Sequence, residues 1–113
     1  MKNKKKIAHR GEFWTINDKR TRGHKSYIVK GNRNREYVLH LPITHKDRTR
    51  NMKNKKLVNN PELNKYDDSY ILPKVQKSSE RSLGKKQKNV KIKNTTDKSV
   101  VRNIIKRNKK KIK

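Results

Sequence analysis

Side chains suited to phosphodiester chemistry gather near the ends of two predicted strands, namely those of Arg22, Lys25, Thr44 and His45. Cleavage of RNA without a metal needs a base that activates the 2′-hydroxyl, an acid for the leaving oxygen, and positive charge near the phosphorane. Histidine transfers protons near neutral pH, lysine or arginine stabilises the developing charge, and a threonine hydroxyl can orient the phosphate. These four residues are therefore the catalytic candidates, and a phosphate-binding patch without turnover is the alternative that their types leave open.

Two predicted strands bring these candidates together. The only long apolar stretch, residues 36–44, has apolar side chains at every second position from Tyr37 to Ile43, as a strand with one buried face requires. Residues 25–30 form a second predicted strand, and the turn residues 31–34 join the two as a hairpin. The start of the 25–30 strand then lies beside the end of the 36–44 strand, which is where the candidates fall.

The charge of the chain is strongly one-sided. Its 113 residues include 35 Lys and Arg but only 9 Asp and Glu, which gives a formal net charge of +26. Solubility alone does not need so large an excess, and a field of this sign attracts polyanions. RNA or DNA is therefore the expected partner, with an acidic protein surface or an anionic membrane in second place.

Three absences limit the remaining classes of protein. The chain has no cysteine, which fits the cytoplasm and excludes disulfides and thiolate metal sites. The four histidines match no metal-binding spacing, so we expect no metal and no other cofactor. No apolar run approaches the ~20 residues of a membrane span, and no membrane association is expected.

Basic residues concentrate in a loop and in a helix. The loop, residues 47–56, follows the central strand and is interpreted as contacting phosphates, with a solvated loop as the alternative. Residues 95–97 supply candidate N-caps, and the apolar residues between Val100 and Ile105 repeat at helical spacing opposite a basic stripe. The predicted nucleic-acid-binding residues of the two regions are Lys46, Arg48, Arg50, Lys53, Lys98, Arg102, Lys106 and Arg107.

The other apolar segments are short and predict a mainly β fold. Only 27% of the residues are hydrophobic, so the core must be small. We expect Trp14 to pack in this core, with stacking on a base as the alternative. We expect His40 to be a hydrogen-bonded packing residue and the central strand to end or bulge at Pro42. Further strands are predicted at residues 12–16, 57–58, 69–75 and 90–93, and a loop or one helical turn at residues 77–84.

These elements predict one small domain with basic extensions. Short strands, a hairpin and a terminal helix indicate a small, strongly bent antiparallel barrel with one helix. The last residues of the chain are expected to fray or to become ordered only on a polyanion. The predicted parts are a basic arm over residues 1–10, the barrel over 11–93, and a basic amphipathic helix and tail over 94–113.

The order of these segments resembles the MazF/PemK family of bacterial toxin endoribonucleases. The resemblance covers residues 11–105, and the order and spacing of the segments match better than any single motif. The matching segments are Gly11-Glu12-Phe13-Trp14, the stretch from Arg22 to Val29, Leu41-Pro42-Ile43-Thr44, the stretch from Asp68 to Lys77, Ser82-Leu83-Gly84, and the terminal helix.

The resemblance implies a small SH3-like barrel and RNA cleavage. It further implies a homodimer and an antitoxin protein that neutralises the enzyme, and it places Thr44 at the position of the family's catalytic threonine or serine. Lys25 stands where the family has a catalytic arginine, and lysine cannot form the bidentate fork to phosphate. This departure favours an alternative, a non-catalytic binder of nucleic acid or of a host nucleoprotein, for example a mobile element's inhibitor of a host nuclease.

Overall fold

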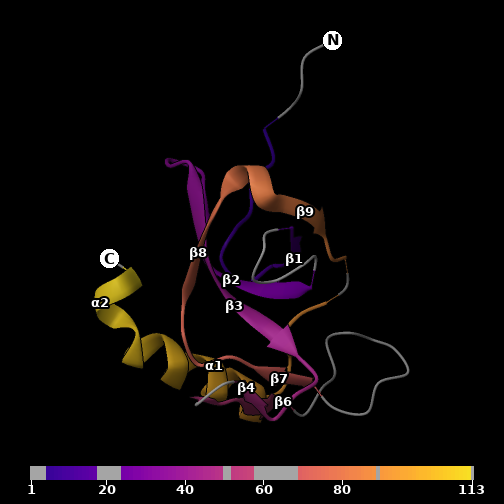
Figure 1. The fold of residues 1–113 in the computed structure, drawn as a ribbon, viewed down its shortest axis with the longest axis vertical. Helices are drawn as coiled ribbons and strands as arrows, with labels where there is room; N and C mark the ends of the chain where they lie inside the picture. The colour runs from indigo at the N-terminus through magenta and orange to yellow at the C-terminus, as the bar shows by residue number, and fades with distance from the viewer. Residues whose placement is uncertain (1–4, 18–23, 50–51, 58–68, 89, 113) are drawn as a thin grey trace.

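The central strand predicted from alternation, β3 (Tyr37–Thr44), is the longest of the described strands and passes through the middle of the molecule (Figure 1). The computed structural model describes residues 5–17, 24–49, 52–57, 69–88 and 90–112. Within these ranges the protein is mainly β, with helix at the C-terminal end, as predicted. None of the described helices is long and apolar enough to cross a membrane.

The remaining elements are short. The other strands are β1 (Phe13–Ile16), β2 (Lys25–Lys30), β4 (Arg48–Thr49), β5 (Met52–Lys53), β6 (Lys55–Leu57), β7 (Ser69–Ile71), β8 (Gln76–Ser79) and β9 (Leu83–Lys86). The helices are the 3-10 turn η1 (Glu80–Ser82), α1 (Thr95–Arg107) and α2 (Lys109–Ile112).

The main sheet is antiparallel and is not closed. Its strands follow the order β6-β7-β3-β2-β1-β9, and β8 also pairs with β3. The predicted hairpin is confirmed, because β2 pairs with β3 in the register that places Ser26 opposite Pro42. The 3-10 turn η1 leads from β8 to β9, so the chain passes from a partner of β3 to a partner of β1.

The strand β3 does not end at Pro42, contrary to the prediction. It continues to Thr44, but its partner on one side changes near this residue. Residues from Tyr37 to His40 pair with β8, whereas Ile43 and Thr44 pair with β7. The proline therefore lies where one ladder gives way to another, a position at which a missing N–H costs little.

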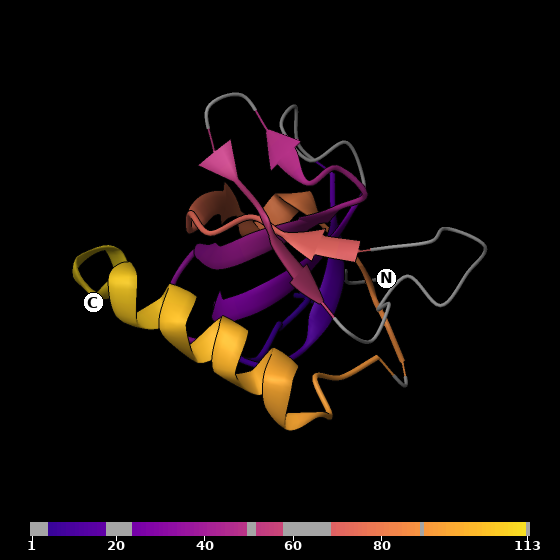
Figure 2. The ribbon, with the colours of Figure 1, turned by 90° about the horizontal axis from the view of Figure 1, so that it is seen from below.

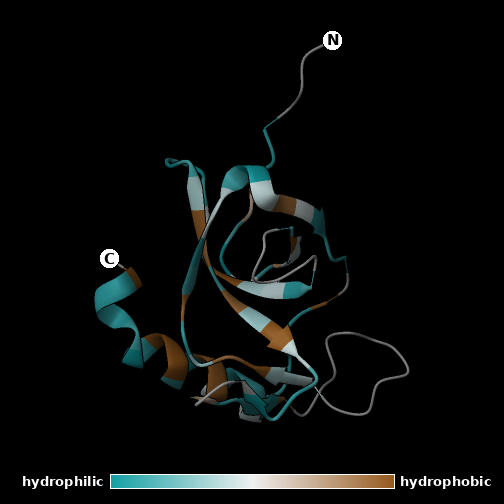
Figure 3. Ribbon diagram, in the orientation of Figure 1, coloured by the Kyte–Doolittle hydropathy of each residue, from teal (hydrophilic) through white to brown (hydrophobic). Residues whose placement is uncertain are grey.

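The alternation along β3 separates two hydrophobic clusters. Leu39, Leu41 and Ile43 belong to the larger cluster, which also includes Phe13 and residues of α1, whereas Val38 belongs to the smaller one. Figure 3 shows the apolar residues along β3, and Figure 2 shows α1 lying against the curved sheet. Both faces of β3 are therefore covered, and all residues from Val38 to Ile43 are buried.

Two predicted packing residues are confirmed. Trp14 is 6% exposed in the smaller cluster, and its indole N–H donates to the Glu12 Oε1 atom at 2.9 Å. His40 is fully buried, and its ring nitrogens lie 3.0 Å from the Ser26 hydroxyl and 2.8 Å from the Ser78 hydroxyl. Burial removes His40 from direct contact with a ligand and leaves Trp14 little surface on which a base could stack.

The N-cap of the terminal helix lies just before the three residues predicted for it. Asn94, not a residue of 95–97, is the N-cap, and its side-chain oxygen accepts from the Asp97 backbone N–H at 2.7 Å. Val101 and Ile104 are buried in the larger cluster, as the helical spacing predicts. The chain beyond α1 forms α2 where we expected fraying, and the Lys30 Nζ atom donates to the Ile112 carbonyl at 2.9 Å.

Three further predictions of local structure are wrong in whole or in part. The stretch 47–56 was predicted as a loop, but its described residues form a small β4–β5 hairpin and most of β6. The stretch 77–84 contains strand as well as the helical turn η1. Residues 90–93 are not a strand, although Val90 is buried in the larger cluster. The polar strands form because they pair with neighbouring strands, and their sequences have no apolar alternation from which they could be predicted.

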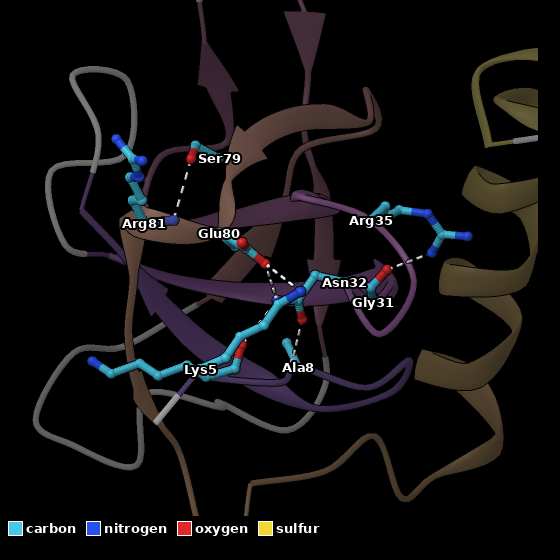
Figure 4. Close-up of polar contacts among 9 residues, drawn as sticks. Lys5, Ala8, Gly31, Asn32, Arg35, Ser79, Glu80 and Arg81 are labelled. Atoms are coloured by element: carbon cyan, nitrogen blue, oxygen red, sulfur yellow. Dashed lines mark hydrogen bonds and ion pairs between the residues drawn. The ribbon is translucent and has the colours of Figure 1, made fainter. Parts of the chain in front are cut away.

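The segment before β1 is attached to the sheet through the buried Asn32 side chain (Figure 4). Its Oδ1 atom accepts from the Ala8 backbone N–H at 2.9 Å, and its Nδ2 atom donates to the Lys6 carbonyl and to Glu80 Oε1. A Cβ atom at Gly31 would meet the Ala8 carbonyl oxygen, so only glycine permits this approach. Ala8 consequently belongs to the smaller hydrophobic cluster.

Candidate nucleic-acid interface

The β2–β3 register places the catalytic candidates at one end of the strand pair. Lys25 lies opposite Thr15 of β1, and Thr44 lies opposite Tyr70 of β7. Because Ser26 faces Pro42, the first residue of β2 and the last residue of β3 lie at the same end. We call this region, with His45, the strand-end site. Arg22, the fourth candidate, lies outside the described residues.

Local hydrogen bonding orients the hydroxyl of the strand-end site. Thr44 is half-buried, and its Oγ1 atom accepts from the Lys46 backbone N–H at 3.3 Å. The bond uses the oxygen as an acceptor and leaves the hydroxyl proton available to donate to a phosphate oxygen. His45 is also half-buried at this turn. The arrangement can hold a phosphate beside groups that transfer protons.

The β4–β5 hairpin presents basic residues next to the strand-end site. Arg48 lies directly opposite Lys53, and both side chains are exposed. The Asn54 side chain holds the base of the hairpin, because its Nδ2 atom donates to the Lys46 carbonyl at 3.0 Å. Like charges opposite each other destabilise a hairpin, and a bound phosphate would relieve the repulsion. Arg50 lies outside the described residues.

A second basic region surrounds a cavity of about 880 Å³ between α1 and the sheet. One stripe of the helix, Lys98, Val101, Arg102 and Ile105, forms one wall, as their spacing of three and four residues requires. Tyr27, Val90 and Ile92 supply further apolar surface. Among the described residues, six basic side chains line the cavity beside one carboxylate, that of Glu12. They are Arg10, Lys86, Lys88, Lys91, Lys98 and Arg102.

The only carboxylate in the cavity lining is already engaged within the described structure. The Lys86 Nζ atom lies 3.0 Å from Glu12 Oε2, while Oε1 accepts from the His9 backbone N–H and the Trp14 indole. Burial, which raises the pKa of Glu12, is outweighed by these hydrogen bonds and by the charge of Lys86, so the pKa is lowered. Glu12 is therefore an anion at neutral pH that is held by its own neighbours.

One aromatic residue, Tyr27, also lines the cavity. Tyr27 is half-buried, and its ring packs edge-to-face on Phe13 with centroids 5.4 Å apart. Burial raises the pKa of Tyr27, and the positive charge of Arg10 opposes this effect only in part. The phenol stays protonated at neutral pH and can donate a hydrogen bond.

The predicted nucleic-acid-binding residues of α1 divide between two places. Lys98 and Arg102 line the cavity, whereas Lys106 and Arg107 are exposed farther along the helix and are not among its lining residues. Sequence reasoning missed the cavity because its basic residues come from separate segments. The sequence assigned Arg10 only to the basic arm. It assigned Lys91 only to a predicted strand, because Lys91 alternates with Val90 and Ile92.

Metal chemistry finds no support in the described part of the chain. No group of three or more His, Asp or Glu residues there lies close enough to hold a metal ion. Comparisons with known proteins add no assignment, since no model of a protein family matches the chain and no curated protein matches it either.

Proposed function

We propose that the protein is an RNA-directed MazF/PemK-like protein that cleaves single-stranded RNA without a metal. The observation that carries the proposal is the β2–β3 register, which puts Lys25 and Thr44 at the same end of the strand pair, where their side chains project to opposite faces around the strand end. The path β9-β1-β2-β3-β8, with η1 between β8 and β9, fits the small SH3-like barrel that the family resemblance implies. A homodimer and a neutralising antitoxin belong to the same proposal.

Each residue of the strand-end site has a role in this proposal. Lys25 stabilises the negative charge of the phosphorane, and the Thr44 hydroxyl donates to a phosphate oxygen. His45 or Arg22 assists, the histidine as a proton donor or acceptor. The 2′-hydroxyl attacks the adjacent phosphorus and loses its proton, the P–O bond to the 5′-oxygen breaks, and that oxygen gains a proton. The products are a cyclic phosphate and a 5′-hydroxyl end.

The test is a single-turnover cleavage assay with excess protein, a mixed-sequence RNA, and EDTA. The native protein should cut at a limited set of sites, and Thr44→Val should slow cleavage by about 10²–10³-fold, as expected when one transition-state donor is lost. Thr95→Val, which removes an exposed hydroxyl at the start of α1, is the matched control and should cleave at the native rate. If the RNA is fully bound by the native protein and stays intact, the proposal that the protein is an endoribonuclease is refuted.

A second candidate function is a non-catalytic binder of nucleic acid or nucleoprotein. It is favoured by Lys25, which replaces the arginine that the resemblance implies and offers a point charge without the bidentate fork. A host nucleoprotein is then the expected partner. A pull-down from bacterial lysate, with and without ribonuclease treatment, distinguishes a nucleic-acid target from a protein target. A partner that is retained after RNA removal indicates a protein target.

A further inference from the structure

We propose that the cavity between α1 and the sheet binds a segment of single-stranded RNA, with phosphates at its basic rim and a base against its apolar wall. This inference rests on the proposed RNA-directed function and deepens it, because it assigns the RNA-holding task to a region other than the strand-end site. One RNA strand can extend from the cavity to Lys25 of the strand-end site, since Lys25 and Tyr27 belong to β2 and project to the same face.

The cavity has the composition of a ligand site rather than of a solvated surface. Its volume of about 880 Å³ is in the range of sites that enclose a small ligand. Val90 and Val101 are buried, and Tyr27, Ile92 and Ile105 are half-buried beside the basic residues. A wall of this kind with a charged rim matches a nucleotide, whose base is apolar on its faces and whose phosphate is anionic.

Among the described residues that line the cavity, the positive charges outnumber the negative ones, so the rim favours a bound anion. Glu12 is the one carboxylate that lines the cavity among the described residues, and it is paired with Lys86. Lys98 lies near the N-terminal end of α1, where a positive charge opposes the helix dipole. Arg102 follows one turn later on the same stripe. A phosphate bound here would reduce both the mutual repulsion and the conflict with the dipole.

Single-stranded RNA fits these features better than a duplex does. A base can contact the apolar wall only if it leaves its stack, and the bases of a duplex are stacked and paired. Stacking and apolar contact are sequence-tolerant, so the cavity should hold RNA of many sequences and leave selectivity to the strand-end site. Tyr27 lines the cavity, and its hydroxyl, which is protonated at neutral pH, adds a hydrogen-bond donor to this residue.

The experiment compares two variants that lose the same charge. The cavity variant is Lys91→Gln/Lys98→Gln/Arg102→Gln. The control variant is Arg33→Gln/Lys74→Gln/Arg81→Gln, whose three residues are exposed and do not line the cavity. All six positions are exposed, so matched thermal midpoints should confirm that both variants fold. Binding of the full chain is measured by fluorescence anisotropy over a series of salt concentrations.

The probe is a labelled ten-nucleotide oligouridine with 2′-O-methyl groups, which prevent attack on the phosphate. The cavity variant should bind at least about tenfold more weakly near 150 mM salt, with a slope of log affinity on log salt that is smaller by about 2. The control variant should lose less than about threefold. A chain of the same length without bases should bind the native protein about tenfold more weakly than the oligouridine.

Three results would overturn the inference, and each is distinct from failure of the proposed function. Equal losses in the two variants would show general charge attraction without a cavity site. If the chain without bases, or an RNA duplex, binds the native protein with the same affinity as the oligouridine, no base is bound in the cavity. If the native protein binds no RNA at all, the proposed function fails together with the inference, whereas RNA binding with equal losses refutes the cavity alone.

Discussion

The strand-end site and the cavity differ in how the chain assembles them. The strand-end site comes from two strands joined by a short turn, and its position follows from one hairpin register. The cavity combines side chains from the segment before β1, from β2, from residues 86–92 and from α1. A hairpin can be recognised in a sequence, but a cavity made by four separate segments depends on tertiary packing. The strand-end site could therefore be predicted from the sequence, whereas the cavity could not.

The two regions also differ in the elements that hold them in place. The strand-end site lies between neighbouring strands, with β1 on one side of the hairpin and β7 on the other. The cavity has α1 as a wall, and the helix is fixed by Val101 and Ile104 and by the buried Asn108. Changes in helix anchoring should therefore alter the cavity and leave the strand end in place. This difference makes the two regions separable by substitution.

The largest expected effect is on cleavage and separates chemistry from binding. Lys25→Ala should lower the single-turnover cleavage rate by about 10²-fold, because it removes positive charge from the phosphorane. Lys25→Arg should retain cleavage, since arginine restores the fork that the family resemblance implies. The affinity for the oligouridine should change less than threefold in both variants. A rate that stays the same in Lys25→Ala would remove this residue from the chemistry.

A smaller effect is expected on the helix that forms the cavity wall. The Asn108 Nδ2 atom donates to the Pro73 and Ile104 carbonyls, and Oδ1 accepts from the Val75 N–H. Asn108→Ala should lower the free energy of unfolding by about 1–3 kcal/mol, because buried partners lose their hydrogen bonds. The measurement is urea denaturation, and RNA affinity should fall more than the cleavage rate at saturation. A variant as stable as the native protein would show that these bonds do not anchor α1.

The basic end of the chain should have a weaker and more general effect. Lys109→Gln/Lys110→Gln/Lys111→Gln removes three exposed charges of α2, which lie outside the cavity lining. Affinity for two unrelated RNAs should fall by the same few-fold factor, and the salt slope should become smaller, because lysine–phosphate contacts carry little base information. The free energy of unfolding should hardly change. A loss confined to one RNA would indicate base recognition by α2.

The smallest expected effect is a pH dependence at Glu12. Its folded-state pKa lies below the ordinary value of 4.5, so the carboxylate stabilises the fold above that pH, and the contribution is lost as pH falls through the folded-state pKa. The native protein should therefore lose stability on acidification more steeply than Glu12→Gln does. Thermal midpoints at about pH 6, 5, 4 and 3 measure this. Parallel curves would show that the bonds to Glu12 do not stabilise the fold.

The sequence predicted the central strand and the terminal helix, which have the longest apolar patterns, whereas the short alternation of Val90 and Ile92 wrongly predicted a strand. Alternation from Tyr37 to Ile43 gave both the central strand and the separation of its faces, and the spacing of Val101 and Ile104 gave the helix. It did not predict β8 or β9, because the segments Gln76–Ser79 and Leu83–Lys86 contain mostly polar residues and become strands by pairing with β3 and β1.

The candidate sites were predictable to different degrees for the same reason. One turn and one register sufficed to place Lys25 and Thr44 at a common end. The cavity needed the position of α1 relative to β2, which long-range packing decides and which no local spacing encodes. Lys98 and Arg102 were predicted to bind nucleic acid, but their association with Arg10 was visible only in the fold.

The most direct test measures the single-turnover cleavage rate in EDTA as a function of protein concentration. The native protein, Lys25→Ala and the cavity variant Lys91→Gln/Lys98→Gln/Arg102→Gln are compared on one mixed-sequence RNA. We expect Lys25→Ala to lower the limiting rate at an unchanged half-saturating concentration, and the cavity variant to raise that concentration at an unchanged limiting rate. If the native protein saturates with RNA and cuts none of it, the claim that the strand-end site cleaves RNA is contradicted.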